Sequence, residues 1–334
     1  MDVLGTVARP GPVAYNSESG ANRIAKGVTV MTRFVFRTRI APGLVRLTAV
    51  FLVLFGGLAA CAAADAPWQA VEEPVRFLRV ASPKDGEPEA LQIATVRCRP
   101  IDGAAADSTV DLIAAVHMAE PEFYTQLNRD FTGYDAVLYE LVAPEGTRVK
   151  KSEPRNTSNP LSLAQHGLTD LLELQFQLEG IDYSAENLVH ADMSPEQFTQ
   201  SMEDRGESFG GLMLRMMGYS LAQQNEGKAA GGDVRLLWSL FSGNRAMALR
   251  RVMAEQFDTM QEAMAVMDGP EGSTLIAERN KVALEVLKKE LDNGKHKIAI
   301  FYGAGHMDDM LARLRDEFGF APKQIRWATA WKLQ

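Results

Sequence analysis

Apolar residues along the chain recur in two patterns, one typical of strands and one typical of helices. Short apolar runs separated by turn-forming residues predict strands at residues 75–80, 91–98, 109–117 and 136–142. Between the last two runs, Phe123, Leu127 and Phe131 recur every fourth residue after Pro121, which predicts a helix. Because a strand, a helix and a strand in this order form a βαβ unit, we expect parallel strands with a right-handed crossover.

The same alternation returns near the C-terminus. Ser273 is placed to cap a helix that runs to about residue 291, and Asn293-Gly294 is placed to end it. A strand at 296–302, a tight turn, a helix at 307–318 and a strand at 325–333 follow. We therefore predict an α/β fold class, with a mixed, largely parallel sheet as its core.

The middle of the chain, about residues 161–267, lacks strand-like runs and is rich in Met and Leu. A helical stripe is formed by residues three or four apart, namely Leu249, Met253, Phe257, Met260, Met264 and Met267. Methionines can form a soft ligand surface, but helical spacing already explains these residues as core. We expect a helical insertion between the two α/β halves of a domain spanning 74–334.

Residues 1–60 have the layout of an export signal. Four arginines between residues 33 and 46 precede the run 47–60, which is apolar apart from Thr48 and shorter than the about 20 residues of a membrane-spanning helix. The run ends in Leu58-Ala59-Ala60-Cys61, which resembles the bacterial lipobox. A conventional signal begins near its Met, so Met31 is an alternative start and residues 1–30 are then not translated.

The lipobox resemblance implies lipidation of Cys61, a tether over residues 61–73 and anchoring through lipid in the bacterial cell envelope. Ala62 after the cysteine implies the periplasmic side of the outer membrane. The alternatives are an ordinary signal peptide cut after Ala64 or an uncleaved anchor. With Cys61 lipidated, Cys98 has no intramolecular partner, so neither disulfides nor a Cys-rich zinc site hold the domain.

Charge separates this leader from the rest of the chain. The protein has 334 residues, of which 46% are hydrophobic and 23% charged, as in soluble globular proteins. Its formal charge is −8, but residues 1–60 hold seven Lys and Arg residues against two Asp and Glu residues. The remainder carries −13, which repels phosphate backbones, so we expect no nucleic acid partner.

Residues able to do chemistry gather where predicted strands end. His117 ends one strand and His306 follows another, and ligands of open α/β sheets bind at the carboxyl ends of strands. Gly303 and Gly305 allow a turn that puts His306 at a helix N-terminus, where imidazole tends to be neutral. With Glu140 on the same edge, the two imidazoles and the carboxylate would suit a divalent ion such as Zn or Mn.

A third group lies on the helix before His306. The apolar positions Leu275 and Val282 place either Glu278 or Arg279 on the face toward the sheet, where a charge needs a defined partner. His190-Ala191-Asp192 also has a spacing typical of ligands. We interpret it mainly as the approach to a helix cap at Ser194.

These segments together resemble the TraB/PrgY/GumN family, which includes the Tiki proteases and is distantly related to erythromycin esterase and ChaN-like proteins. The resemblance rests on residues 110–140, on Glu278-Arg279-Asn280 and on Gly303-Ala304-Gly305-His306. The family has two Gly-x-x-His motifs, a Glu ending the strand after the first, and a Glu-Arg-Asn helix before the second. Here the first motif begins with Ala114, whose methyl group narrows the space beside His117.

The resemblance implies a metal-dependent hydrolase that acts on peptides or other amide or ester substrates. His117, Glu140 and His306 would hold or adjoin a divalent metal, Mn, Co or Zn, while Glu278 acts as general base and Arg279 stabilises an oxyanion, beside Asn280. Two non-catalytic alternatives stay open. One is a haem-binding lipoprotein of the ChaN-like type, with His117 or Tyr124 as axial ligand; the other is an inactive relative that binds a peptide without cutting it.

Overall fold

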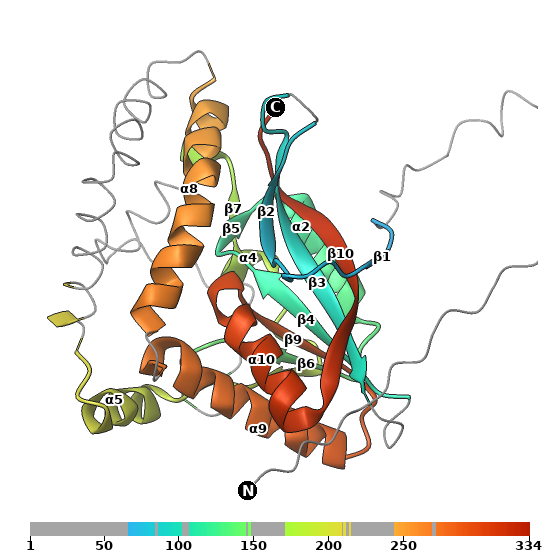
Figure 1. Ribbon diagram of the computed structural model, residues 1–334, viewed down its shortest axis with the longest axis vertical. Coiled ribbons are helices and arrows are strands. Elements are labelled where there is room, and N and C mark those ends of the chain that lie inside the picture. The colour runs from blue at the N-terminus through green and yellow to red at the C-terminus, as the bar shows by residue number, and fades with distance from the viewer. Residues whose placement is uncertain are drawn as a thin grey trace, which may run out of the picture. The chain divides into compact units, whose positions relative to one another are not determined.

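The computed structural model (Figure 1) describes residues 66–83, 86–101, 107–144, 146–147, 171–208, 210–211, 214, 244–268 and 272–334. The expected export signal and the lipid site at Cys61 lie outside these residues, as do the side chains of Met260, Met264 and Met267. Residues 64–334 form one compact unit. Among the described residues, no helix combines the length and the apolar character needed to cross a membrane.

A mixed sheet is the centre of the described part of the chain. Its eight strands lie in the order β1-β10-β3-β4-β9-β6-β8, with β2 paired to β3. They are β1 (Gln69–Ala70), β2 (Leu78–Ala81), β3 (Ala90–Pro100), β4 (Thr109–Ala115), β6 (Ala136–Tyr139), β8 (Leu188–His190), β9 (Lys297–Gly303) and β10 (Phe320–Lys332). Strands β4, β9, β6 and β8 are parallel, and the other pairs are antiparallel. The α/β fold class with a mixed sheet is confirmed.

Three of the parallel strands, β4, β6 and β9, have near-continuous apolar sequence, because both of their faces are covered. Every residue of β6 is buried, as are six of the seven residues of β4 and five of the seven of β9. Helix α2 (Pro121–Phe131) buries Phe123, Leu127 and Phe131 as its spacing predicts. Figure 1 shows α2 behind the sheet, and α9 (Arg279–Asp292) and α10 (Met307–Phe318) in front of it. Strand β9 lies between β4 and β6, so the two strands of the expected βαβ unit are parallel without pairing directly.

The middle of the chain contains two short strands that its sequence pattern does not indicate. Residues 188–190 form β8, which extends the sheet by pairing with β6, and β7 (Gln175–Phe176) pairs with β5 (Met118–Ala119). These strands have two or three residues and no apolar run, so their pairing comes from the open edge of a neighbouring strand. The rest of the described middle is helical, in α4 (Gln177–Gly180), α5 (Pro195–Asp204) and α8 (Arg245–Asp268).

The segment expected to be a tether contributes to the fold. Gln69 and Ala70 form β1, which pairs with Ile325 and Gln324 of β10. The guanidinium groups of Arg97 and Arg326 lie 4.1 Å and 5.2 Å from the ring centroid of Trp68. The folded unit therefore includes residues ahead of 74.

Helix α5 begins with the capping box expected from the sequence. The Ser194 hydroxyl accepts a hydrogen bond from the N–H of Gln197, whose side chain accepts one from the N–H of Ser194. We predict that Ser194→Ala lowers the free energy of unfolding by about 1 kcal/mol, measured by urea denaturation, because helix donors lose their partner.

Thr199→Ala is the matched control on the same helix. The Thr199 hydroxyl donates a hydrogen bond to the carbonyl of Pro195, which belongs to the same helix. Its loss should leave the denaturation midpoint nearly unchanged. Equal midpoint shifts for the two variants would mean that the cap does not stabilise the domain.

Candidate functional site

The candidate site lies where three neighbouring parallel strands end. Tyr139 at the end of β6 pairs with His190 of β8 and Phe301 of β9. The chain then continues from these strands to Glu140, Asp192 and His306. Their side chains therefore meet at the carboxyl edge of the sheet, the usual place for ligands in open α/β sheets.

The guanidinium of Arg279 is the centre of this group. It donates to both oxygens of Asp192, from Nε to Oδ1 at 2.9 Å and from Nη2 to Oδ2 at 2.6 Å. Nη2 also donates to Oε1 of Glu140 at 2.7 Å, and Nη1 lies 3.5 Å from Nε2 of His306. Arg279 is only 6% exposed, and these carboxylates raise the pKa of Arg279 although burial alone would lower it. It is a fixed positive charge.

Glu140 is held as a carboxylate. Its Oε1 accepts from Arg279, and its Oε2 accepts from the backbone N–H of Gly303 at 2.7 Å. Burial alone would raise the pKa of Glu140, but His306, Arg279 and the Gly303 N–H together lower it to about 2. A Cβ atom at position 303 would stand 3.2 Å from Oε2, so glycine here provides room for the carboxylate.

His306 is held as a neutral imidazole. The side-chain amide of Asn280 donates to the carbonyl of His306 at 3.0 Å and to Asp309 at 2.8 Å, so its oxygen faces Nδ1 of His306 at 2.8 Å. Nδ1 therefore carries the proton, and Nε2 presents its lone pair to Arg279 and Glu140. Burial lowers the pKa of His306, with Arg279 acting in the same direction against Glu140.

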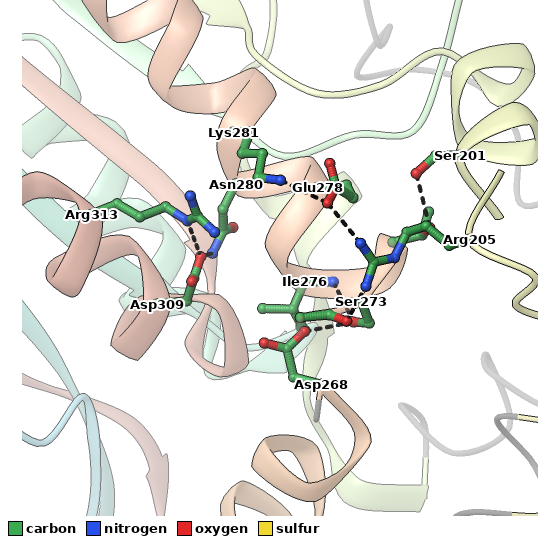
Figure 2. A network of polar contacts seen from close by, with 12 residues as sticks. Ser201, Arg205, Asp268, Ser273, Ile276, Glu278, Asn280, Lys281, Asp309 and Arg313 are labelled. Carbon is green, nitrogen blue, oxygen red and sulfur yellow. Dashed lines mark hydrogen bonds and ion pairs between the residues drawn. The ribbon is translucent and has the colours of Figure 1, made fainter. Parts of the chain in front are cut away.

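The turn before His306 differs from expectation in its backbone. Residues Ala304–His306 form the short 3-10 helix η3, and neither Gly303 nor Gly305 has a positive φ. The turn therefore uses the small size of Gly303 rather than its conformational freedom. Figure 2 shows Asp309 between Asn280 and Arg313. Arg313 donates a hydrogen bond to Asp309 at 2.8 Å, and Asp309 in turn accepts one from the Asn280 amide.

Glu278 faces a different part of the molecule from Arg279 and Asn280. The π-helical turn η2 (Thr274–Glu278) precedes α9, and Glu278 is its last residue. Glu278 accepts from Arg205 at 3.1 Å and from Lys281 at 2.8 Å (Figure 2). It lines an open cleft of about 630 Å³ beside α5. Of the two residues that the helical pattern could place toward the sheet, Arg279 is the one that faces it.

His117 also stands apart from the other expected metal ligands. Its side chain is exposed and stacks on Phe176, with ring centroids 6.4 Å apart. Glu140 and His306 do meet, at 3.5 Å, but the described residues contain no group of three His, Cys, Asp or Glu side chains placed to hold a metal ion. Arg279 and the N–H of Gly303 already occupy the two carboxylate oxygens of Glu140. The described residues therefore do not fit the three-ligand metal centre.

The other residues named for the first motif are part of the core. Ala114 is fully buried in β4. The Tyr124 hydroxyl donates to the carbonyl of Val116 at 2.9 Å, and its ring packs so closely on Gly180 that a Cβ there would lie 2.5 Å away. Tyr124 would have to leave the core to reach a haem, whereas His117 is already accessible.

Asp192 belongs to this group of residues, although the sequence indicates it mainly as the approach to the Ser194 cap. Asp192 is brought to the site by the short strand β8, which has no apolar run. Its partners are Arg279 and the N–H of Met193, which donates at 2.8 Å. The neighbouring carbonyl of Ala191 accepts from the buried Tyr302 hydroxyl.

No protein-family model, no curated protein and no solved structure matches the chain. The family resemblance inferred from the motifs therefore stays a prediction.

We predict that Asp192→Ala lowers the free energy of unfolding by about 3–5 kcal/mol, since it leaves the buried charge of Arg279 without its bidentate partner. Urea denaturation followed by circular dichroism measures this loss. Glu317→Ala is the matched control, because Glu317 is half exposed and pairs with Arg313 at 3.0 Å on the surface of α10. Removing that pair should cost less than about 1 kcal/mol. Similar losses for both variants would contradict the importance of the buried pair.

Proposed function

We propose that this protein is a hydrolase of peptide or other amide or ester bonds, with His306 as its general base. The observation that carries the proposal is the state of His306: its Nδ1–H is held by Asn280, while its unprotonated Nε2 lies 3.5 Å from Nη1 of the buried Arg279 guanidinium. A neutral, oriented imidazole next to a fixed cation is the pair of groups that acyl-bond hydrolysis needs.

In the proposed reaction, Nε2 of His306 takes a proton from a water molecule as its oxygen attacks the carbonyl carbon of the substrate. The imidazolium that forms lies 3.5 Å from the Glu140 carboxylate, which stabilises it. The proton then passes to the leaving nitrogen or oxygen as its bond to carbon breaks. Asn280 keeps the ring in one orientation throughout.

Arg279 supplies the positive charge that faces the developing oxyanion. Because Asp192 and Glu140 hold its guanidinium before the substrate arrives, little reorganisation is needed during the reaction. Substrate reaches the group from the side of Glu140, whose side chain is 17% exposed. The exposed imidazole of His117 follows β4 on the same edge and is available to contact the substrate.

The setting of this activity follows from the sequence. The lipobox resemblance favours a body tethered through Cys61 in the bacterial cell envelope, acting on a peptide or a small molecule there. The resemblance to the TraB/PrgY/GumN family also favours hydrolysis. Its expected divalent metal, Mn, Co or Zn, would need a third ligand beyond Glu140 and His306, so no step above depends on one.

We predict that His306→Ala lowers kcat/KM by about 100-fold or more, the usual contribution of a general base. The assays are release of p-nitrophenol from p-nitrophenyl acetate and release of peptides from fluorescein-labelled casein. His296→Ala is the matched control and should keep full activity, because His296 is exposed and contacts Ser108 at the opposite end of the sheet. Binding of casein without cleavage by the wild type would favour the non-catalytic alternative. Activity that disappears on chelation and returns with Mn²⁺ would contradict the metal-free steps.

The pH profile gives a separate check. The base must be unprotonated, and burial lowers the pKa of His306 from its ordinary value of 6.5. We therefore predict that kcat/KM of the wild type rises with pH along an acid limb centred below pH 6.5 and is level above it. An acid limb centred above pH 6.5 would mean that a different group is titrating.

A further inference from the structure

We infer that the guanidinium of Arg279 is the resident cation of this site and takes the position in which a divalent metal ion would otherwise be held. Three polar groups face it: the carboxylates of Asp192 and Glu140 and the Nε2 lone pair of His306. With Arg279 between them, these described residues are not placed to hold a metal ion themselves. One nitrogen, Nη2, is shared by an oxygen of each carboxylate, at 2.6 Å and 2.7 Å.

The charges of the group support this assignment. The two carboxylates carry two negative charges, the guanidinium carries one positive charge and His306 is neutral. A second cation would have to enter between Arg279 and its partners, against the repulsion of a charge held only a few ångströms away. The group keeps a net charge of −1, but every carboxylate oxygen in it already accepts a hydrogen bond from Arg279 or from the N–H of Gly303.

Asp192 gives the guanidinium its fixed place. Its two oxygens engage Nε and Nη2 side by side, the bidentate geometry that arginine forms with carboxylates and lysine cannot. Nη1 in addition lies 3.4 Å from the carbonyl of Leu275 in the π-helical turn. Asp192 is accordingly a positioning residue, which acts on the site through Arg279.

Removing the guanidinium should expose a metal site. Arg279→Ala would remove the guanidinium that lies between the two carboxylates. They and the imidazole could then close on one cation, and such mixed oxygen and nitrogen ligands suit Mn²⁺ or Zn²⁺. The inference concerns the site of the proposed function, but its measurement is binding. A chain without hydrolytic activity could therefore still confirm it, and an active chain could still overturn it.

The experiment compares wild type, Arg279→Ala and the double variant Arg279→Ala/Asp192→Ala during titration with MnCl₂. Free Mn²⁺ is followed by electron paramagnetic resonance, and the melting temperature is recorded with and without the metal. We expect about one bound Mn²⁺ per chain and a metal-dependent rise in melting temperature for Arg279→Ala alone. The wild type and the double variant should show neither effect at the same concentrations.

A second variant guards against failure of Arg279→Ala to fold. Arg279→Gln keeps an amide donor for Asp192 without the charge, and it should also gain Mn²⁺ binding. Stoichiometric Mn²⁺ binding by the wild type that is lost in His306→Ala would overturn the inference. So would a folded Arg279→Ala or Arg279→Gln protein that takes up no more Mn²⁺ than the wild type.

Discussion

The requirement that a buried guanidinium be paired determines how the two halves of the sheet edge come together. Arg279 is the first residue of α9, and its partners follow β6 and β8 and lie beside the N-terminus of α10. Leaving this charge unpaired would cost several kcal/mol, so the packing of α9 on the sheet is tied to the positions of Glu140 and Asp192. The ends of β6 and β8, the start of α9 and the His306 imidazole therefore depend on one another through this buried charge.

A second buried ion pair holds the helical middle of the chain against the rest of the domain. Arg250 on α8 is 5% exposed, pairs with Glu120 at 2.7 Å and donates to the carbonyl of Leu172 at 2.7 Å. Glu120 comes directly before α2, so this pair joins the start of α2 to a helix far along the sequence. The Glu278–Arg205 pair is partly exposed by contrast, and its contribution to stability is correspondingly smaller.

A group that is so fully paired serves both the fold and the proposed chemistry. The contacts that stabilise Arg279 also keep it immobile, and immobile charges stabilise a transition state without first having to reorient. Burial keeps His306 neutral, while the adjacent Glu140 is ready to stabilise its protonated form. The arrangement is therefore suited to a single proton transfer beside a fixed positive charge.

The features that could be predicted from the sequence are those that leave a pattern in neighbouring residues. The strands β4, β6 and β9 and the helix α2 were predictable because burial on two faces, or on one helical face, leaves a period in the residues themselves. Glu140 and His306 were identifiable for a related reason, because they follow such strands. Asn280 was named only through the family resemblance. The Ser194 cap was equally predictable, because its pattern lies within the four residues 194–197.

Tertiary structure alone decided the rest. The sequence left Glu278 and Arg279 as equal choices, and only the packed structure shows Arg279 bound to Asp192 and Glu140 while Glu278 pairs with Arg205. Asp192 became a partner because the three residues of β8 pair with an open strand edge, which is a long-range contact without a local pattern. His117 follows a predicted strand, as His306 does, yet its side chain is exposed beside Phe176. Sequence period determines which residues are buried, whereas only the packed chain determines which buried charges meet.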